Sequence, residues 1–155
     1  MIFIQKVLIA TFVFISSVAM DPAIQAPEKS PVKFELRRAE SKPAPGLTEA
    51  EVAGTKDKVY LHKDVAITNK DIAATRATAD ASNKPAIEIT LTKEGQKKFA
   101  ELSREHQGRP LAIMADGKVL GAPTVRGKIS GDRAVIHGNF TKEEAERIAN
   151  GIRQK

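Results

Sequence analysis

The sequence predicts an α+β fold, a mainly antiparallel sheet with two main helices packed on one face. Three observations support this: an alternating strand over residues 86–91, an Asp116-Gly117 hairpin signal, and an amphipathic final helix that starts after Thr141. At 155 residues the chain fits one domain with a tail. Aromatic residues make up 5% of the chain and Trp is absent, so Ile, Val, Leu, Ala and Phe must build the core.

Residues 1–26 have the pattern of an export signal. Lys6 precedes a largely apolar run over residues 7–18, and Ser17-Val18-Ala19 fits a small-x-small cleavage pattern, with cleavage after Ala26 as a second option. The apolar run is shorter than the roughly 20 residues of a membrane-spanning helix, so an uncleaved anchor is the alternative. We therefore expect a periplasmic or otherwise extracytoplasmic protein. It contains no Cys, so it folds without disulfides.

After a polar linker at residues 27–31, residues 32–155 form the predicted domain, with an N-terminal extension over 32–85 and a core over 86–153. Within the extension, the alternation at 32–36 predicts a half-buried strand. Residues 37–46 are expected to be a loop and residues 59–61 a short edge strand. Thr68 is expected to cap a short helix over 69–76, with Asp71 near its positive end and Ile72 packed inward.

The strand at 86–91 leads into the first main helix. Ile87, Ile89 and Leu91 share one face of the strand. Thr92 is suited to cap the helix, and Phe99 and Leu102 lie three residues apart on one helical face.

Turn residues then end this helix and shape a hairpin. Gly108 follows the helix where a left-handed residue is favoured, and Pro110 prevents continuation. Residues 111–115 are an unbroken apolar run, expected to be a strand covered on both faces. Asp116-Gly117 favours a tight turn with positive φ at both positions, and the returning strand stops at Pro123.

Two further strands, over residues 124–129 and 133–137, are expected on either side of a Gly131-Asp132 turn. The final helix then begins with a capping box of Thr141 and Glu144. Its apolar positions follow the spacing of a helix that lies on a sheet: Ala145, Ile148, Ala149 and Ile152.

A search for catalytic or ligand-binding patterns favours a binding module over an enzyme. No Cys is present. His62, His106 and His137 lie far apart in sequence and none forms a paired ligand motif, so we expect no metal and no cofactor. No phosphate-binding loop occurs, and the Asp116-Gly117 turn by itself accounts for Asp116. The net charge of +6 arises from interspersed acidic and basic residues, which favours a solvated surface over nucleic-acid binding.

The second half of the chain resembles the head subdomain of the first periplasmic domain of the SecD/SecDF protein-export family. Weaker similarity extends back to Lys33-Phe34-Glu35-Leu36 and over residues 59–76. One departure is Gly121, where the family usually has Ser before Ala-Pro. The resemblance rests on an ordered series of short matches: residues 87–91, Gly95, Phe99, Leu102-Ser103, Gly108, residues 111–113, residues 116–119, Ala122-Pro123, Ile129, Ala134, Ile136, Gly138, Phe140-Thr141, Glu144-Ala145 and Ala149.

The resemblance implies a polypeptide-binding fold that lacks the family's transmembrane, proton-driven part, because the sequence ends at Lys155. One hypothesis is an exported module that binds unfolded or exported polypeptide, with possible association with the translocon. The other is a regulatory or inhibitory adaptor for one envelope protein, with residues 37–58 as its contact. The family-motif residues, structural or peptide-contacting, are Gly95, Phe99, Gly108, Asp116, Gly117, Ala122, Pro123, Gly138 and Phe140.

Overall fold

The computed structural model describes residues 31–152. The predicted signal at 1–26, most of the linker and residues 153–155 lie outside this range. Five antiparallel strands form the first sheet, in the order β2-β3-β1-β6-β7. They are β1 (Phe34–Glu40), β2 (Thr48–Glu51), β3 (Lys58–Thr68), β6 (Leu111–Ala115) and β7 (Lys118–Gly121).

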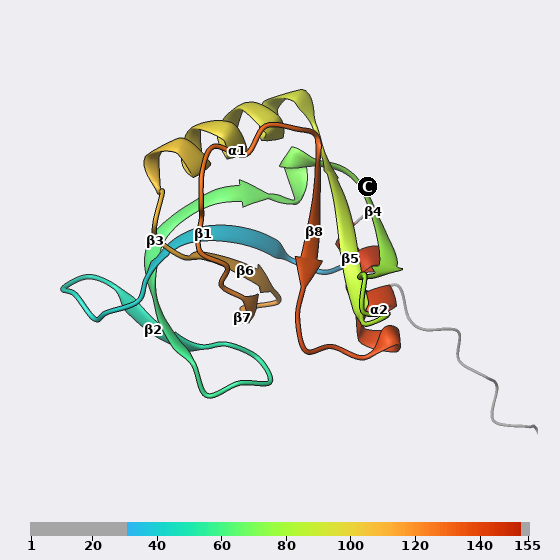
Figure 1. Cartoon of the computed structure of the whole chain (residues 1–155), viewed down its shortest axis with the longest axis horizontal. Coiled ribbons are helices and arrows are strands. Elements are labelled where there is room, and N and C mark those ends of the chain that lie inside the picture. The colour runs from blue at the N-terminus through green and yellow to red at the C-terminus, as the bar shows by residue number, and fades with distance from the viewer. Residues whose placement is uncertain (1–30, 153–155) are drawn as a thin grey trace, which may run out of the picture.

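A second antiparallel sheet has the order β4-β5-β8. Its strands are β4 (Ile72–Ala79), β5 (Pro85–Leu91) and β8 (Arg133–His137). Figure 1 shows this sheet beside the curved strands β1 and β3 of the first sheet. The prediction of one sheet was therefore wrong, although the α+β class and the antiparallel pairing are confirmed.

The two helices contact different parts of these sheets. α1 (Lys93–Glu105) lies against β3, β5 and the short 3-10 helix η1 (Asn69–Asp71), whereas α2 (Lys142–Ile152) packs on β4 and β5. In Figure 1, α1 runs over β3 and β1, and α2 lies near the lower ends of β4 and β5. The expected packing of both helices on one face of a single sheet is not shown: both contact β5, but α1 also lies against β3 of the first sheet and α2 against β4 of the second.

Edge strands of the first sheet meet, which gives the sheet the curvature of a small barrel. Val52, just after β2, forms a parallel bridge with Val119 of β7, and the N–H of Ala53 donates to the Val119 carbonyl at 2.8 Å. A separate apolar cluster fills this curled sheet: Ala39, Val59, Leu61, Ala112, Met114 and Val119. The full burial of Ala39 and Ala112 shows that the strands leave little space there.

The main core joins the two sheets and both helices. Phe34 and Ile67 enter it from the first sheet, Ile87 from the second, Leu102 from α1, and Ile148 from α2. The predicted inner faces of residues 86–91 and of the final helix are confirmed, because Ile87, Ile89, Leu91, Ala145, Ile148, Ala149 and Ile152 are all buried. Core residues therefore come from widely separated segments, so the sheets and helices stabilise one another.

Four local predictions in the chain differ from the structure. Residues 37–40 belong to β1 and not to a loop, and the short edge strand at 59–61 is part of the long inner strand β3. The predicted helix at 69–76 is only η1, after which β4 begins. Most of residues 124–129 form no strand, although Thr124 bridges Pro110. In each case, pairing with another strand, or its absence, decided the outcome.

Candidate functional site

An apolar groove lies where the two sheets and α1 come together. Two adjoining pockets of about 410 and 210 Å³ form it. Both are lined by Leu36, Phe99, Ile113, Pro123 and Ile129. We call these two pockets together the apolar groove. The larger pocket falls in the range of about 300–1,000 Å³ typical of ligand pockets.

Ile129 and Val135 make this groove unusual within residues 31–152. They are the large hydrophobic residues that the described structure leaves exposed, at 39% and 43% of their surface. Ile129 lines both pockets and Val135 lines the smaller one. Scattered single apolar residues on a surface are normal, but two beside one apolar groove mark a candidate interaction site.

One wall of the groove is the edge strand β8. β8 pairs with β5 on one side and ends the order of its sheet, so its other side has no strand partner within the described residues. Residues 133–136 of β8 line the smaller pocket. An edge strand presents unpaired N–H and C=O groups to an incoming extended chain. The groove thus combines apolar side chains with available backbone groups.

At one corner beside the groove, the backbones of the two sheets come close together. An added Cβ at Gly121, at the end of β7, would lie 3.2 Å from the His137 carbonyl of β8, and one at Gly138 would lie 3.0 Å from the Leu120 carbonyl. At this corner the backbones therefore approach closely, as only small residues permit. The connection between β7 and β8 then runs from here toward α1 and returns as β8 (Figure 1).

This connection is held against α1 by a buried serine. The hydroxyl of Ser103, which is fully buried, accepts a hydrogen bond from the N–H of Ile129 at 2.9 Å and donates to the Ala100 carbonyl at 3.0 Å. Val125 is buried in the main core and pairs its N–H with the Arg109 carbonyl. These contacts place Ile129 at the mouth of the groove.

Of the nine family-motif residues, Phe99 and Pro123 line the groove. Ala122 packs instead on the cluster inside the curled sheet. Phe140 packs at the edge of the main core, and an added Cβ at Gly138 would overlap its ring. These five positions therefore divide between the groove and the structural core.

The motif glycines at each end of α1 have structural explanations. Gly95 lies so close to the Asp71 carbonyl oxygen that an added Cβ would overlap it. Gly108 adopts φ +75, the left-handed conformation expected after a helix. The expected cap is confirmed as well, because the Gly95 N–H donates to the Thr92 hydroxyl at 3.0 Å.

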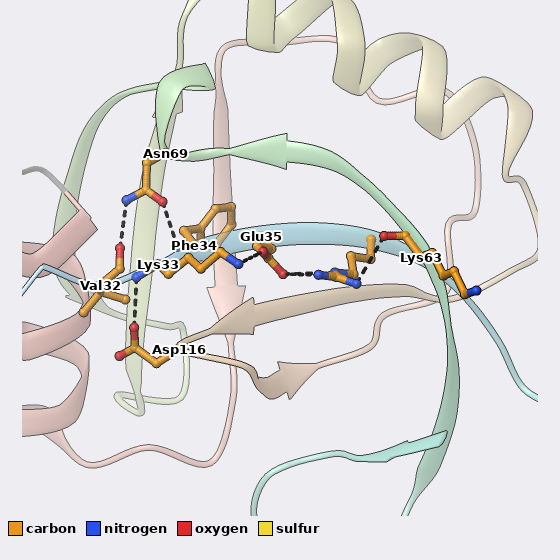
Figure 2. A network of polar contacts seen from close by, with 8 residues as sticks. Val32, Lys33, Phe34, Glu35, Lys63, Asn69 and Asp116 are labelled. Atoms are coloured by element: carbon orange, nitrogen blue, oxygen red, sulfur yellow. Dashed lines mark hydrogen bonds and ion pairs between the residues drawn. The ribbon is translucent and has the colours of Figure 1, made fainter. Parts of the chain in front are cut away.

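Asp116 and Gly117 form the predicted turn, with φ values of +50 and +79. Figure 2 shows a further role for Asp116: its carboxylate accepts the Lys33 N–H at 2.9 Å. The side-chain amide of Asn69 bonds both the Val32 carbonyl and the Phe34 N–H at 2.8 Å. Two side chains thus hold the start of β1 in place, and neither of them lines the groove.

Two buried carboxylates next to this region are also structural. Glu35 lies between Lys33 and Arg37, at 2.6 and 2.7 Å, and Figure 2 shows its contact with Lys33. Burial raises the pKa of Glu35, but the hydrogen bonds from these cations outweigh burial and lower it overall. The Asp71 carboxylate similarly bonds Lys98 at 2.6 Å and the Thr68 N–H at 2.9 Å. Their charges are neutralised within the fold.

The three histidines make structural contacts, and the rings of His62 and His106 meet edge to face with their centroids 6.3 Å apart. His106 is buried, and its Nε2 lies 3.0 Å and 3.1 Å from the carbonyl oxygens of Ala39 and Pro110. Because carbonyls only accept, this nitrogen carries the proton. His62 contacts Glu40 and His137 contacts Asp80. Among residues 31–152, no group of three or more acidic, His or Cys side chains could hold a metal ion.

Sequence reasoning did not single out Val135. One signal was available: alternation in the strand 133–137 places Val135 on the side of Arg133 and His137, opposite the buried Ile136. An apolar residue between two charged or polar ones on an outward face is a candidate contact. Its position beside Ile129 required the tertiary structure.

The chain belongs to the SecDF P1 head subdomain family, whose model matches residues 32–154. The SecDF translocase subunit of Thermus thermophilus is 44% identical over 87 residues, covering 56% of this chain and 12% of that protein. The SecD translocase subunit of Acidaminococcus fermentans is 35% identical over 136 residues, covering 83% of this chain and 31% of that protein. The chain therefore spans less than a third of either relative.

Solved SecDF structures have the same fold. The crystal structure of SecDF in a super-membrane-facing form matches with a TM-score of 0.65 and 29% identity, covering 82% of this chain and 19% of that one. A structure of a membrane component SecDF that enhances protein export matches with a TM-score of 0.64 and 28% identity, covering 81% of this chain and 63% of that one. In the described part of this chain, no helix has the length and apolar character needed to cross a membrane.

Proposed function

We propose that this protein is an extracytoplasmic binding module of protein export, which acts by holding unfolded polypeptide and not by catalysis. The observation that carries the proposal is the joint position of Ile129 and Val135 at the apolar groove beside the edge of β8. An extended polypeptide can add to such an edge as a strand while its apolar side chains enter the groove. Relatives named as protein translocase subunits support an export-related partner.

The proposal concerns the binding step alone. It carries over neither the transport activity of the whole relatives nor their membrane partners, because this chain matches only part of them. Binding of exposed apolar segments is favourable in itself, since each buried apolar side chain contributes up to about 1.5–3 kcal/mol.

Site-directed photo-crosslinking tests the proposal, and the absence of native Cys makes each introduced thiol unique. Ile129→Cys and Val135→Cys carry a thiol-linked photoprobe at the groove. Glu146→Cys on α2, which lines no part of the groove, is the matched control. The client is a chemically reduced and carboxymethylated lactalbumin, which stays unfolded.

We expect both groove probes to crosslink to the unfolded client and the control to crosslink far less. Folded lactalbumin should not compete. Equal crosslinking from all three positions, or none from the groove, would overturn the proposed site.

A further inference from the structure

The apolar groove is surrounded by cations. Arg126 and Lys128 line the larger pocket and Arg133 lines the smaller one, whereas no Asp or Glu lines either. All three side chains belong to exposed residues, in the connection before β8 and at the start of β8 itself. The groove thus has an apolar floor and a positive rim.

Charge on this rim is not neutralised by nearby acids of the described chain. Arg126 and Lys128 form no ion pair with any residue in the range 31–152. The charge of Arg133 attracts the Glu88 carboxylate and helps to lower its pKa. However, Arg76 already donates hydrogen bonds to both oxygens of that carboxylate, at 2.8 and 2.9 Å. Asp132 is adjacent in sequence and exposed, yet it does not line the groove. The rim therefore keeps an excess of positive charge.

We propose that the groove selects apolar polypeptide segments that have acidic residues next to them and disfavours segments with basic flanks. This inference rests on the proposed function, because it names which polypeptides the same groove takes. The apolar floor contributes affinity for any apolar segment. The rim adds attraction for carboxylates, since charges along a low-dielectric surface focus the field on an approaching ligand.

Anisotropy measurements with three labelled peptides test this selectivity. The peptides share one core of Leu, Val and Phe, and carry Asp-Glu, Ser-Gly or Lys-Arg at both ends. We expect the acidic-flanked peptide to bind the full chain about tenfold more tightly than the basic-flanked one at low salt. The difference should shrink as added salt shortens the screening length, which is about 3 Å at 1 M.

Two double variants separate the rim from overall charge. Arg126→Glu with Lys128→Glu reverses the rim, and we expect the order of the peptides to reverse. Lys93→Glu with Lys97→Glu changes the net charge equally, on exposed residues of α1 that line neither pocket, and should preserve the order. Because all four residues are exposed, these substitutions should leave folding intact.

The outcomes distinguish the selectivity from the binding function. Equal binding of all three peptides would overturn the selectivity and leave the proposed function standing. A reversed order of peptide affinities in the Lys93→Glu with Lys97→Glu control would have the same meaning. Failure of every peptide to bind would overturn the proposed function itself. Sedimentation with phosphatidylglycerol vesicles that requires Arg126 and Lys128, without peptide discrimination, would reassign the rim to a membrane surface.

Discussion

Gly95 illustrates how a single position of the family motif is explained by tertiary contact. It lies in the first turn of α1, where local propensity would favour Ala by about 1 kcal/mol. The Asp71 carbonyl occupies the space that a Cβ would need, and the same carbonyl accepts the Thr92 N–H at 2.9 Å. For Gly95→Ala, helix propensity therefore predicts a gain in stability, whereas packing predicts a loss.

We predict that Gly95→Ala lowers the free energy of unfolding by about 1–2 kcal/mol, because the overlap with a backbone atom outweighs the gain in helix propensity. Urea unfolding measures the change. Gly108→Ala is the control: an added Cβ there meets no atom within 4 Å, so only the left-handed conformation is penalised. A stabilised Gly95→Ala variant would show that η1 moves away easily.

Asp71 carries a pH-dependent part of the stability. Burial raises the pKa of this carboxyl, but the bonds from Lys98 and Thr68 prevail and lower it below its usual value. A carboxyl with a depressed folded-state pKa stabilises the fold above its unfolded pKa, which is about 3.9. That contribution is lost as the pH falls through the lower, folded-state pKa.

We therefore expect Asp71→Asn to reduce stability by about 1–2 kcal/mol at pH 7, because it loses a charge-assisted hydrogen bond. The difference from the wild type should shrink below about pH 4, as followed by urea unfolding at several pH values. Glu49→Gln, which disrupts the exposed pair with Lys58, should change stability much less. A difference that stays constant from pH 7 to acid would contradict the role of ionised Asp71.

At the scale of elements, the connection between β7 and β8 depends on α1 for its position. The hydroxyl of Ser103 bonds the Ile129 N–H, and the Val125 backbone pairs with Gly108 and Arg109. The segment has little regular structure of its own, so these contacts to other elements determine where it runs. The position of Ile129 at the mouth of the groove therefore depends on the Ser103 side chain, which lies in α1 more than twenty residues earlier in the chain.

We predict that Ser103→Ala loosens this connection and lowers stability by about 1 kcal/mol, because the Ile129 N–H loses its buried acceptor. Amide hydrogen exchange should accelerate at Ile129 more than in β5. Ser130→Ala, at an exposed neighbouring position, is the control and should leave exchange at Ile129 unchanged. Unchanged exchange at Ile129 in Ser103→Ala would mean that other contacts hold the segment.

At the scale of the whole molecule, the groove exists because residues of both sheets, of α1 and of the connection before β8 line it together. Neither sheet alone forms it: Leu36 and Ile113 come from the first, Val135 from the second, Phe99 from α1, and Ile129 from a connection. Its function and its stability should therefore be separable, because the exposed residues at the mouth add little to the core.

We predict that Ile129→Ser combined with Val135→Ser weakens binding of an apolar peptide about tenfold or more while changing the free energy of unfolding by less than about 0.5 kcal/mol per site. Fluorescence anisotropy and urea unfolding measure the two quantities. Leu102→Ala is the converse control. Because Leu102 is buried, this substitution should lower the free energy of unfolding by about 2–5 kcal/mol. Unchanged peptide affinity in the double Ser variant would place binding elsewhere.

Sequence alone determined the elements whose signals are local. Thr92, the Asp116-Gly117 turn and the capping box are confirmed because each depends on contacts within a few residues; in the capping box the Thr141 N–H bonds Glu144 at 2.8 Å and the Glu144 N–H returns to Thr141 at 3.2 Å. The faces of residues 86–91 and of α2 followed from periodicity in the same way. The domain limits and the roles of the motif residues in binding stay predictions.

Only the tertiary structure decided how these elements combine. Residues 72–76, rich in Ala, were predicted to be helical, but pairing with β5 from Ile72 to Ala79 made them a strand. β1 joined β3 and β6, partners far along the chain, and the sheet divided into two. Strand pairing overrides weak local propensity because it satisfies many backbone groups and buries apolar faces together. The groove arises from that assembly, so no local pattern could reveal it.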